Sequence, residues 1–160
     1  MALRSVALPP GVPGTLLLGP MPGRFDSWST FDADARQRKL AWVVCLTPRG
    51  EMAELAPAYD RAVRQGEVPF RWTHSPMPNF GVPDDKVAYR REVAEIAGAL
   101  RKGESVMLHC AAGIGRTGST ASCVLKALGL DTQEALQRVR AAGSNPENAK
   151  QSGFVDWFLA

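Results

Sequence analysis

The sequence predicts an α/β domain, and three of its properties support that prediction. Its 160 residues suit one domain with a single hydrophobic core. Apolar residues make up 45% of the chain and charged residues 22%, a mix that is typical of globular domains. Short apolar runs bounded by turn residues alternate with longer segments of helical periodicity, which is the pattern of strands and helices packed in layers.

Four short apolar runs are expected to form strands. In chain order they cover residues 15–18, 40–46, 70–74 and 105–109. The first lies in the segment 1–24, which is rich in proline and predicts an irregular arm docked on the domain, with this run as its one strand. The last run is the only strand candidate among the helical patterns that follow residue 84. We therefore expect residues 105–109 to form a central, buried strand flanked by helices.

Helical patterns cover residues 51–65, 84–101, 117–128, 132–141 and about 147–159. The second pattern follows Pro83 and opens with two acids, which is the usual chemistry of a helix start, and Asp84 is its expected cap. Asp131 or Thr132 is expected to cap the fourth helix.

The composition also narrows the classes of function. The net charge of +3 is spread evenly and forms no basic block, so nucleic acid is not an expected partner. Prolines interrupt the apolar start before it could form a signal sequence or a membrane span, which predicts a cytoplasmic protein with no membrane association. An odd count of three cysteines fits a reducing compartment. No cysteine pair has ligand spacing, and His74 and His109 are far apart in sequence, so neither a metal nor another cofactor is expected.

The segment SVMLHCAAGIGRTGS, residues 105–119, carries the clearest chemical pattern in the chain. Cys110 ends an apolar strand, a loop of small residues follows, and a helical pattern starts at Thr117. Such a loop turns successive backbone N–H groups into one concavity, where the helix dipole adds partial positive charge. The concavity suits a tetrahedral oxyanion and favours a thiolate at Cys110. Arg116 offers a planar fork that two phosphate oxygens accept together, which a lysine does not match.

The string HCAAGIGRTG resembles the signature loop of the cysteine-dependent protein tyrosine and dual-specificity phosphatases. The resemblance extends over about residues 40–158. There, VVCLTPRGEM and HSPMPNFGVPDD are similar to the small branch that contains the cyclin-dependent-kinase-associated phosphatase and compact archaeal and bacterial phosphatases. The resemblance implies one phosphatase domain over residues 1–160, with the cysteine phosphatase fold of this class: a central mixed sheet of about four to five strands flanked by helices.

The resemblance also implies a two-step reaction, in which Cys110 attacks phosphorus and water then hydrolyses the cysteinyl-phosphate. Thr117 is expected to hydrogen-bond the sulfur when it leaves, and His109 to orient the loop rather than act as a base. Gln151, in NAKQSGF, matches a glutamine that positions the hydrolytic water in many relatives, and a surface-facing helix residue is the alternative. The phosphate oxygens would be bound by the loop amides and the arginine fork, from residues Ala111, Ala112, Gly113, Ile114, Gly115 and Arg116.

One position departs from the family pattern. Relatives carry an aspartate as general acid where this chain has Asn79, in PNFGVP, and an amide has no titratable proton near neutrality. Three interpretations are open: Asn79 is an introduced, slow or substrate-trapping replacement of aspartate; the protein is naturally slow or restricted to good leaving groups; or Asp84 or Asp85 supplies the proton. His74 and Pro76 match residues before this loop in relatives and are expected to shape it.

The loop also bears on substrate and redox chemistry. Relatives that hydrolyse phosphoinositides carry lysines at the positions of Ala111 and Ile114, so a phosphorylated protein side chain or a small aryl phosphate is the expected substrate. Cys45 matches a place where some relatives hold a second cysteine, and it either forms a reversible disulfide with Cys110 or packs as a small apolar residue. Cys123 is expected to pack in the core.

Two rival functions remain from other classes. Asn79 suggests a phosphopeptide-binding pseudophosphatase. A rhodanese-type sulfurtransferase also cradles an anion around a loop cysteine, but an arginine followed by Thr117 favours phosphate over sulfane sulfur. A monomer is expected in each case.

Overall fold

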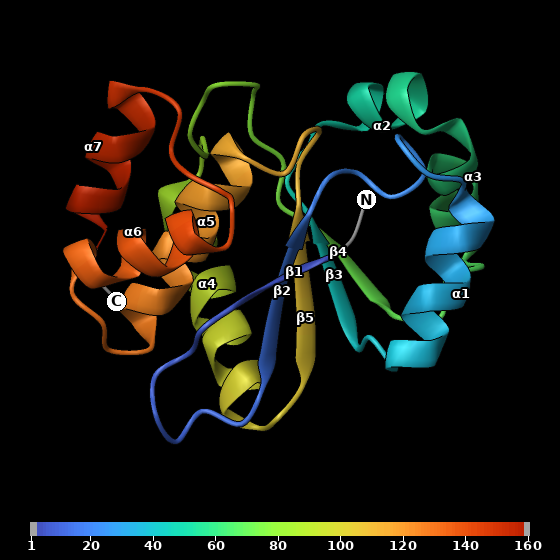
Figure 1. Cartoon of the computed structure of the whole chain (residues 1–160). Coiled ribbons are helices and arrows are strands. Elements are labelled where there is room, and N and C mark those ends of the chain that lie inside the picture. The colour runs from blue at the N-terminus through green and yellow to red at the C-terminus, as the bar shows by residue number, and fades with distance from the viewer. Residues whose placement is uncertain (1–2, 159–160) are drawn as a thin grey trace.

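The computed structural model describes residues 3–158, and their five strands form one mixed sheet in the order β1-β2-β5-β3-β4 (Figure 1). The central strand β5 pairs in parallel with β2 on one side and β3 on the other, whereas β1 runs antiparallel to β2 at the edge. The predicted α/β class, mixed sheet and central strand are therefore confirmed. The strands are β1 (Arg4–Val6), β2 (Thr15–Gly19), β3 (Trp42–Cys45), β4 (Arg71–His74) and β5 (Ser105–His109).

Helices cover both faces of the sheet, with α1 to α3 on one side and α4 to α7 on the other (Figure 1). Along β5, Val106 and Leu108 point into the core shared with α4 to α7, while Met107 points to the opposite core, as the two-residue period of a strand requires. The helices are α1 (Trp28–Arg38), α2 (Arg49–Leu55), α3 (Pro57–Gln65), α4 (Lys86–Arg101), α5 (Gly115–Ala127), α6 (Thr132–Ala141) and α7 (Ala149–Trp157).

The N-terminal segment and the region that follows it differ from the prediction. The proline-rich arm is not irregular throughout, because residues 4–6 form strand β1, which is only three residues long and gives little periodicity to recognise. Helix α1 was not predicted at all. Among its residues only Ala35 is fully buried, so the helix lacks a clear apolar stripe.

Helix boundaries also differ. The predicted helix 51–65 is two helices that meet at Ala56, because Pro57 lacks an N–H group to continue α2 and instead starts α3. Helix α4 is capped by Asp85, whose side chain accepts the Ala88 N–H, and not by Asp84. Helix α5 starts two residues before the predicted start, at Gly115. Helix α6 has its predicted bounds, and α7 is shorter than the predicted segment, whose end at Leu159 lies outside the described residues.

Within residues 3–158, no helix is both long enough and apolar enough to cross a membrane.

Candidate active site

The loop that carries Cys110 leaves the central strand β5 and enters α5 at the centre of the molecule. Because β2, β3 and β5 are parallel, their carboxyl ends meet at one edge of the sheet, where α/β proteins commonly place their sites. Every residue of α5 from Gly115 to Leu125 is buried. The amino end of this helix is therefore directed at the loop from a fixed position.

Four carbonyl groups of the loop accept hydrogen bonds from the rest of the protein. A trans peptide unit directs its C=O and the following N–H in opposite directions, and the described chain contains no cis peptide bond. The N–H groups that follow these carbonyls therefore point away from the carbonyls' partners. The contacts are Cys110 O with His109 Nδ1 (3.0 Å), Ala111 O with Met21 N (3.2 Å), Gly113 O with Arg4 Nη2 (2.8 Å) and Ser144 Oγ (2.6 Å), and Ile114 O with Gly118 N (2.7 Å) and Asn145 N (3.1 Å).

Gly113 is required at its position for two reasons. Its φ angle is +77°, which other residues rarely adopt. In addition, a Cβ atom there would overlap the backbone of Gly19 and Pro20. The loop thus fits against the end of β2 only without a side chain at this residue.

Cys110 is almost completely buried, and the hydroxyl of Thr117 donates a hydrogen bond of 3.0 Å to its sulfur. Thr117 lies in the first turn of α5, so the helix positions the donor directly. A hydroxyl donor favours negative charge on sulfur, both in a free thiolate and when the sulfur leaves a phosphorylated intermediate.

Arg116 has its hydrogen-bond donors divided between the protein and the cavity. Glu51 accepts one bond from each terminal nitrogen, both at 2.9 Å, and Met77 O accepts a further bond from Nη1 at 3.1 Å. A guanidinium has five donors, and these contacts use three of them. The other two, the Nε–H and one Nη2–H, lie along one edge, and the side chain also interacts with the sulfur of Cys110. This edge matches two oxygens of a phosphate group.

The charge of Arg116 is secured by the same contacts. Burial alone would lower the pKa of Arg116, but the hydrogen bonds to Glu51, together with the charges of Glu51 and Cys110, raise it. The side chain is 2% exposed and that of Glu51 is 25% exposed. Glu51 therefore holds the arginine charged and fixed in orientation before any substrate arrives.

A cavity of about 270 Å³ lies over Cys110 and Arg116. Of the six predicted phosphate-binding residues, Ala111, Ala112, Gly115 and Arg116 line it, whereas Gly113 and Ile114 do not, and Asn79 also lines it. The remaining lining residues are Arg24, Glu51, Leu55, Phe80 and Glu147.

Asn79 lies in a turn that is tied to the start of α7. Asn148 Nδ2 donates to Phe80 O at 2.9 Å, and Gln151 Nε2 donates to Gly81 O at 3.3 Å. Gln151 is fully buried, so the alternative of a surface-facing residue is wrong. Its side chain lies behind the cavity wall, where its Oε1 also accepts the Glu147 N–H at 2.7 Å.

His109 orients the loop through a chain of hydrogen bonds. Its Nδ1 must donate to Cys110 O, because a carbonyl only accepts, so its Nε2 accepts from Tyr59 OH at 2.8 Å. Tyr59 OH in turn accepts from Trp72 Nε1 at 2.8 Å. Burial lowers the pKa of His109 to about 4, so the ring is neutral at physiological pH and acts as a positioning group.

Several other predicted residues lie outside the cavity. His74 donates to Thr47 O at 2.6 Å and, with Pro76, Asp84 and Asp85, lines a different cavity. Neither aspartate is thus in the cavity that contains the Cys110 thiol.

Cys45 is on β3, with its Cα paired with that of His109. Its sulfur is 3.2 Å from Thr47 Oγ1 and 3.6 Å from Met52 Sδ, and burial raises its pKa to about 11. Cys45 and Cys110 pack in different apolar clusters, and both are free cysteines. Cys123 is fully buried in the core, as predicted.

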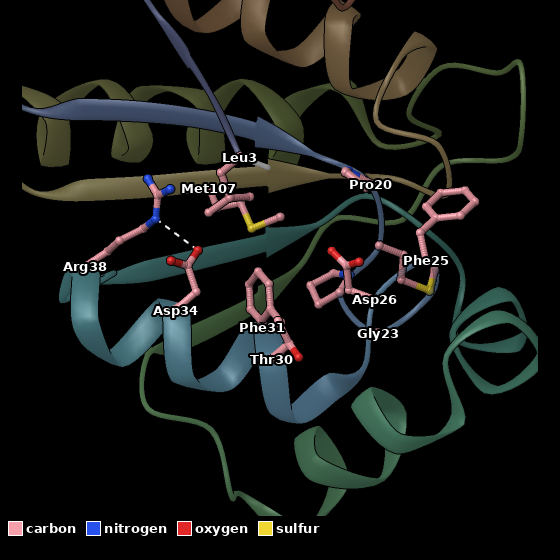
Figure 2. Close-up of a pocket in the computed structure, with 12 residues that line it drawn as sticks. Leu3, Pro20, Gly23, Phe25, Asp26, Thr30, Phe31, Asp34, Arg38 and Met107 are labelled. Carbon is pink, nitrogen blue, oxygen red and sulfur yellow. Dashed lines mark hydrogen bonds and ion pairs between the residues drawn. The ribbon is translucent and has the colours of Figure 1, made fainter. Parts of the chain in front are cut away.

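A larger cavity, of about 350 Å³, lies between α1 and the sheet (Figure 2). Phe25, Phe31 and Met107 form part of its apolar lining, and Asp34 pairs with Arg38 at one end (Figure 2). It contains no residue of the cysteine loop. Size alone would therefore select a cavity that lacks the cysteine loop.

Among the residues that sequence reasoning missed, four are charged and contact the loop or line its cavity: Arg4, Arg24, Glu51 and Glu147. Glu51 was within the quoted string VVCLTPRGEM, so a search for a carboxylate partner of the buried arginine could have found it. Arg4 gave no signal, because its contact with Gly113 joins residues 109 positions apart.

Comparison with known proteins agrees with this geometry. A family model described as the DSP-PTPase phosphatase domain of Swiss Army Knife proteins matches residues 21–152. No curated protein sequence matches the chain.

Solved structures share the fold. The kinase associated phosphatase with its catalytic cysteine replaced by serine is 18% identical, with a TM-score of 0.83 over 97% of this chain and 92% of that one. The active form of Tk-PTP is 25% identical, with a TM-score of 0.71 over 97% and 95% of the two chains. The human tyrosine phosphatase-like serine/threonine/tyrosine-interacting protein is 19% identical, with a TM-score of 0.67 over 94% and 92%. With the family model covering most of its length, the chain belongs to the DSP-PTPase family and is a cysteine-dependent phosphatase domain.

Proposed function

We propose that the protein hydrolyses phosphate monoesters in two steps, with Cys110 as nucleophile and Arg116 as phosphate anchor. The observation that carries this proposal is the 3.0 Å hydrogen bond from Thr117 Oγ1 to Cys110 Sγ, in a loop that leads from β5 into the amino end of α5. A hydroxyl donor beside Cys110 assists a sulfur that must carry negative charge, and the amino end of α5 faces the same loop.

In the first step the Cys110 thiolate attacks phosphorus, and the bond from phosphorus to the ester oxygen breaks. The loop amides and the free edge of Arg116 bind the non-bridging oxygens as charge spreads over them. In the second step water displaces the sulfur from phosphorus, and the Thr117 hydroxyl stabilises the departing thiolate.

The cavity lining supports a substrate of modest charge. Ala111 and Ala112 line the cavity without positive charge, and Leu55 and Phe80 add apolar surface for an aryl or alkyl group. Arg24 supplies one cation besides Arg116. These features favour a phosphorylated protein side chain or a small aryl phosphate over a polyanionic lipid headgroup, and we propose that this substrate is met in the cytoplasm by a monomer.

Replacement of Cys110 by serine tests the proposal. Cys110→Ser should abolish phosphate release from p-nitrophenyl phosphate while the circular dichroism spectrum and melting temperature stay close to those of the parent. Arg116→Lys should also lose most activity, because lysine keeps the charge but not the bidentate edge. Persistent turnover by Cys110→Ser would rule out the covalent mechanism.

Asn79 favours a second candidate function, that of a module that binds phosphopeptides without hydrolysing them. In that case the parent protein would bind a phosphotyrosine peptide in a calorimeter and release no phosphate from it. Release of phosphate that depends on Cys110 would exclude this candidate.

A further inference from the structure

The leaving oxygen of a phosphorylated side chain needs a proton as its bond to phosphorus breaks. Asn79 lines the cavity but has no proton to give. Asp84 and Asp85 line a different cavity, and Asp85 is already engaged as the cap of α4. Among the described residues, the carboxylates that line the cavity over Cys110 are those of Glu51 and Glu147.

These two carboxylates have different surroundings. Glu51 is bound through both oxygens by Arg116, so its carboxylate is already occupied. Within residues 3–158, no hydrogen bond or ion pair holds the carboxylate of Glu147. Glu147 therefore has a carboxyl group that is available to exchange a proton with a substrate in the cavity.

The position of Glu147 depends on Gly115, the first residue of α5. A Cβ atom on Gly115 would overlap the Glu147 carboxyl group, so the carboxyl group lies directly against the Gly115 backbone. Gly115 is also part of the cavity wall next to Arg116. The absence of a side chain at Gly115 thus admits the Glu147 carboxyl group to the wall of the phosphate site.

The backbone of Glu147 is fixed by the same buried glutamine that holds the Asn79 turn. Gln151 Oε1 accepts the Glu147 N–H, and Gln151 Nε2 donates to Gly81 O. The segment of Glu147 and the turn of Asn79 are therefore joined on one side of the cavity. A proton donor on either segment would approach a bound ester from this side.

We propose that Glu147 is the acid–base catalyst of this phosphatase, in place of a carboxyl group at position 79. The proposal rests on the proposed function of Cys110. In the first step the S–P bond forms, the ester O–P bond breaks, and the Glu147 carboxyl proton moves to the leaving oxygen. In the second step the Glu147 carboxylate takes a proton from water as the new O–P bond forms and the S–P bond breaks, so the starting state is restored.

Glu147→Gln tests the acid role through its dependence on the leaving group. For a phosphotyrosine peptide, whose phenol is weakly acidic, kcat/KM should fall by about 10²-fold or more, whereas for an aryl phosphate with a strongly acidic phenol it should change by less than about threefold. The loss of kcat/KM at high pH, where the acid has given up its proton, should be absent in the variant. A merely structural role would lower the rate for both substrates alike.

Asn79→Asp in the Glu147→Gln background provides a rescue. With the phosphotyrosine peptide, kcat/KM of the double variant should be at least tenfold higher than that of Glu147→Gln alone, because Asn79→Asp restores a carboxyl group on the same side of the cavity. Asp84→Asn is the matched control, since it neutralises a carboxylate in the other cavity and should leave the kinetics unchanged.

The results separate the two proposals. If Glu147→Gln keeps the parent's leaving-group dependence and pH profile while Cys110→Ser is inactive, Glu147 is not the acid, and the proposed role of Cys110 as nucleophile is unaffected. If the parent shows no turnover that depends on Cys110, the proposed function is wrong, and the role of Glu147 that rests on it is wrong as well. Melting temperatures within about 2 °C of the parent would show that the substitution has not unfolded the domain.

Discussion

The bidentate contact between Glu51 and Arg116 permits a quantitative prediction. Glu51→Gln keeps the shape of the side chain but removes the charge, and its amide group can accept from only one of the two terminal nitrogens. Arg116 then remains buried with one neutral amide oxygen in place of two carboxylate oxygens, and with Met77 O as its backbone partner. Both stability and catalysis should suffer, for different reasons.

The loss of stability follows from the charges. Two unit charges about 4 Å apart attract by about 4 kcal/mol at the effective dielectric constant of a partly buried site. Because the Glu51 side chain is 25% exposed, solvent screens part of this, and we expect a loss of about 2 kcal/mol in the free energy of unfolding. For a domain of this size that corresponds to a fall of about 4–8 °C in the melting temperature.

The loss of activity follows from orientation. If the guanidinium no longer presents its free edge, one of two charge-assisted hydrogen bonds to the phosphate is lost in the transition state. Such a bond contributes about 1.5–3 kcal/mol, so kcat should fall about 10- to 100-fold.

Steady-state kinetics with p-nitrophenyl phosphate and thermal unfolding measure the two effects separately. Glu54→Gln is the control, because Glu54 is on the same helix but exposed to solvent, and it should change neither quantity. An unchanged kcat in Glu51→Gln would show that Arg116 does not depend on this carboxylate for its orientation.

Three further outcomes are expected. The folded-state pKa of His109 lies below its value in the unfolded chain, so the unfolded chain binds more protons between about pH 6.5 and 4. The free energy of unfolding should therefore fall by up to about 3 kcal/mol as the pH is lowered through this window, and it should fall less in His109→Asn. Denaturant titrations at several pH values measure this, and an equal fall in the two proteins would contradict the buried neutral ring. Asp85→Ala should cost about 1 kcal/mol of stability by chemical denaturation without affecting turnover, while Asp84→Ala should cost less, and the reverse order would contradict the observed cap. After mild peroxide treatment, a thiol reductant should restore less activity in Cys45→Ser than in the parent, and equal recovery would leave Cys45 with a packing role.

The parts of the site that were predictable are those encoded within a few consecutive residues. Cys110, the small-residue loop, Arg116 and Thr117 form one string between a strand and a helix, and the resemblance of that string to the family signature implied the contact from Thr117 to the sulfur. The central position of β5 was also predictable, since helical patterns surround it.

The remainder depends on contacts between distant segments. Glu51 and Arg116 are 65 residues apart in sequence, so no local pattern of residues indicates their contact. Asp84 and Asp85 are equally plausible caps by residue type, and only the backbone at the start of α4 distinguishes them. Helix α1 escaped prediction because its contacts with the sheet come mainly from half-buried aromatic residues rather than a buried stripe.

The cysteine loop is held by residues from opposite ends of the sequence, and this has a consequence for the order of events in time. Arg4 and Ser144 both bind Gly113 O, and Asn145 binds Ile114 O. When Cys110 emerges during synthesis, Ser144 and Asn145 have not yet been made, so the loop lacks two of the partners that bind its carbonyl groups. Closing contacts over such long separations is slow compared with forming local helices. Recovery of activity in a refolding experiment should therefore coincide with the last folding phase, when the segment after α6 docks, and helical signal should return earlier.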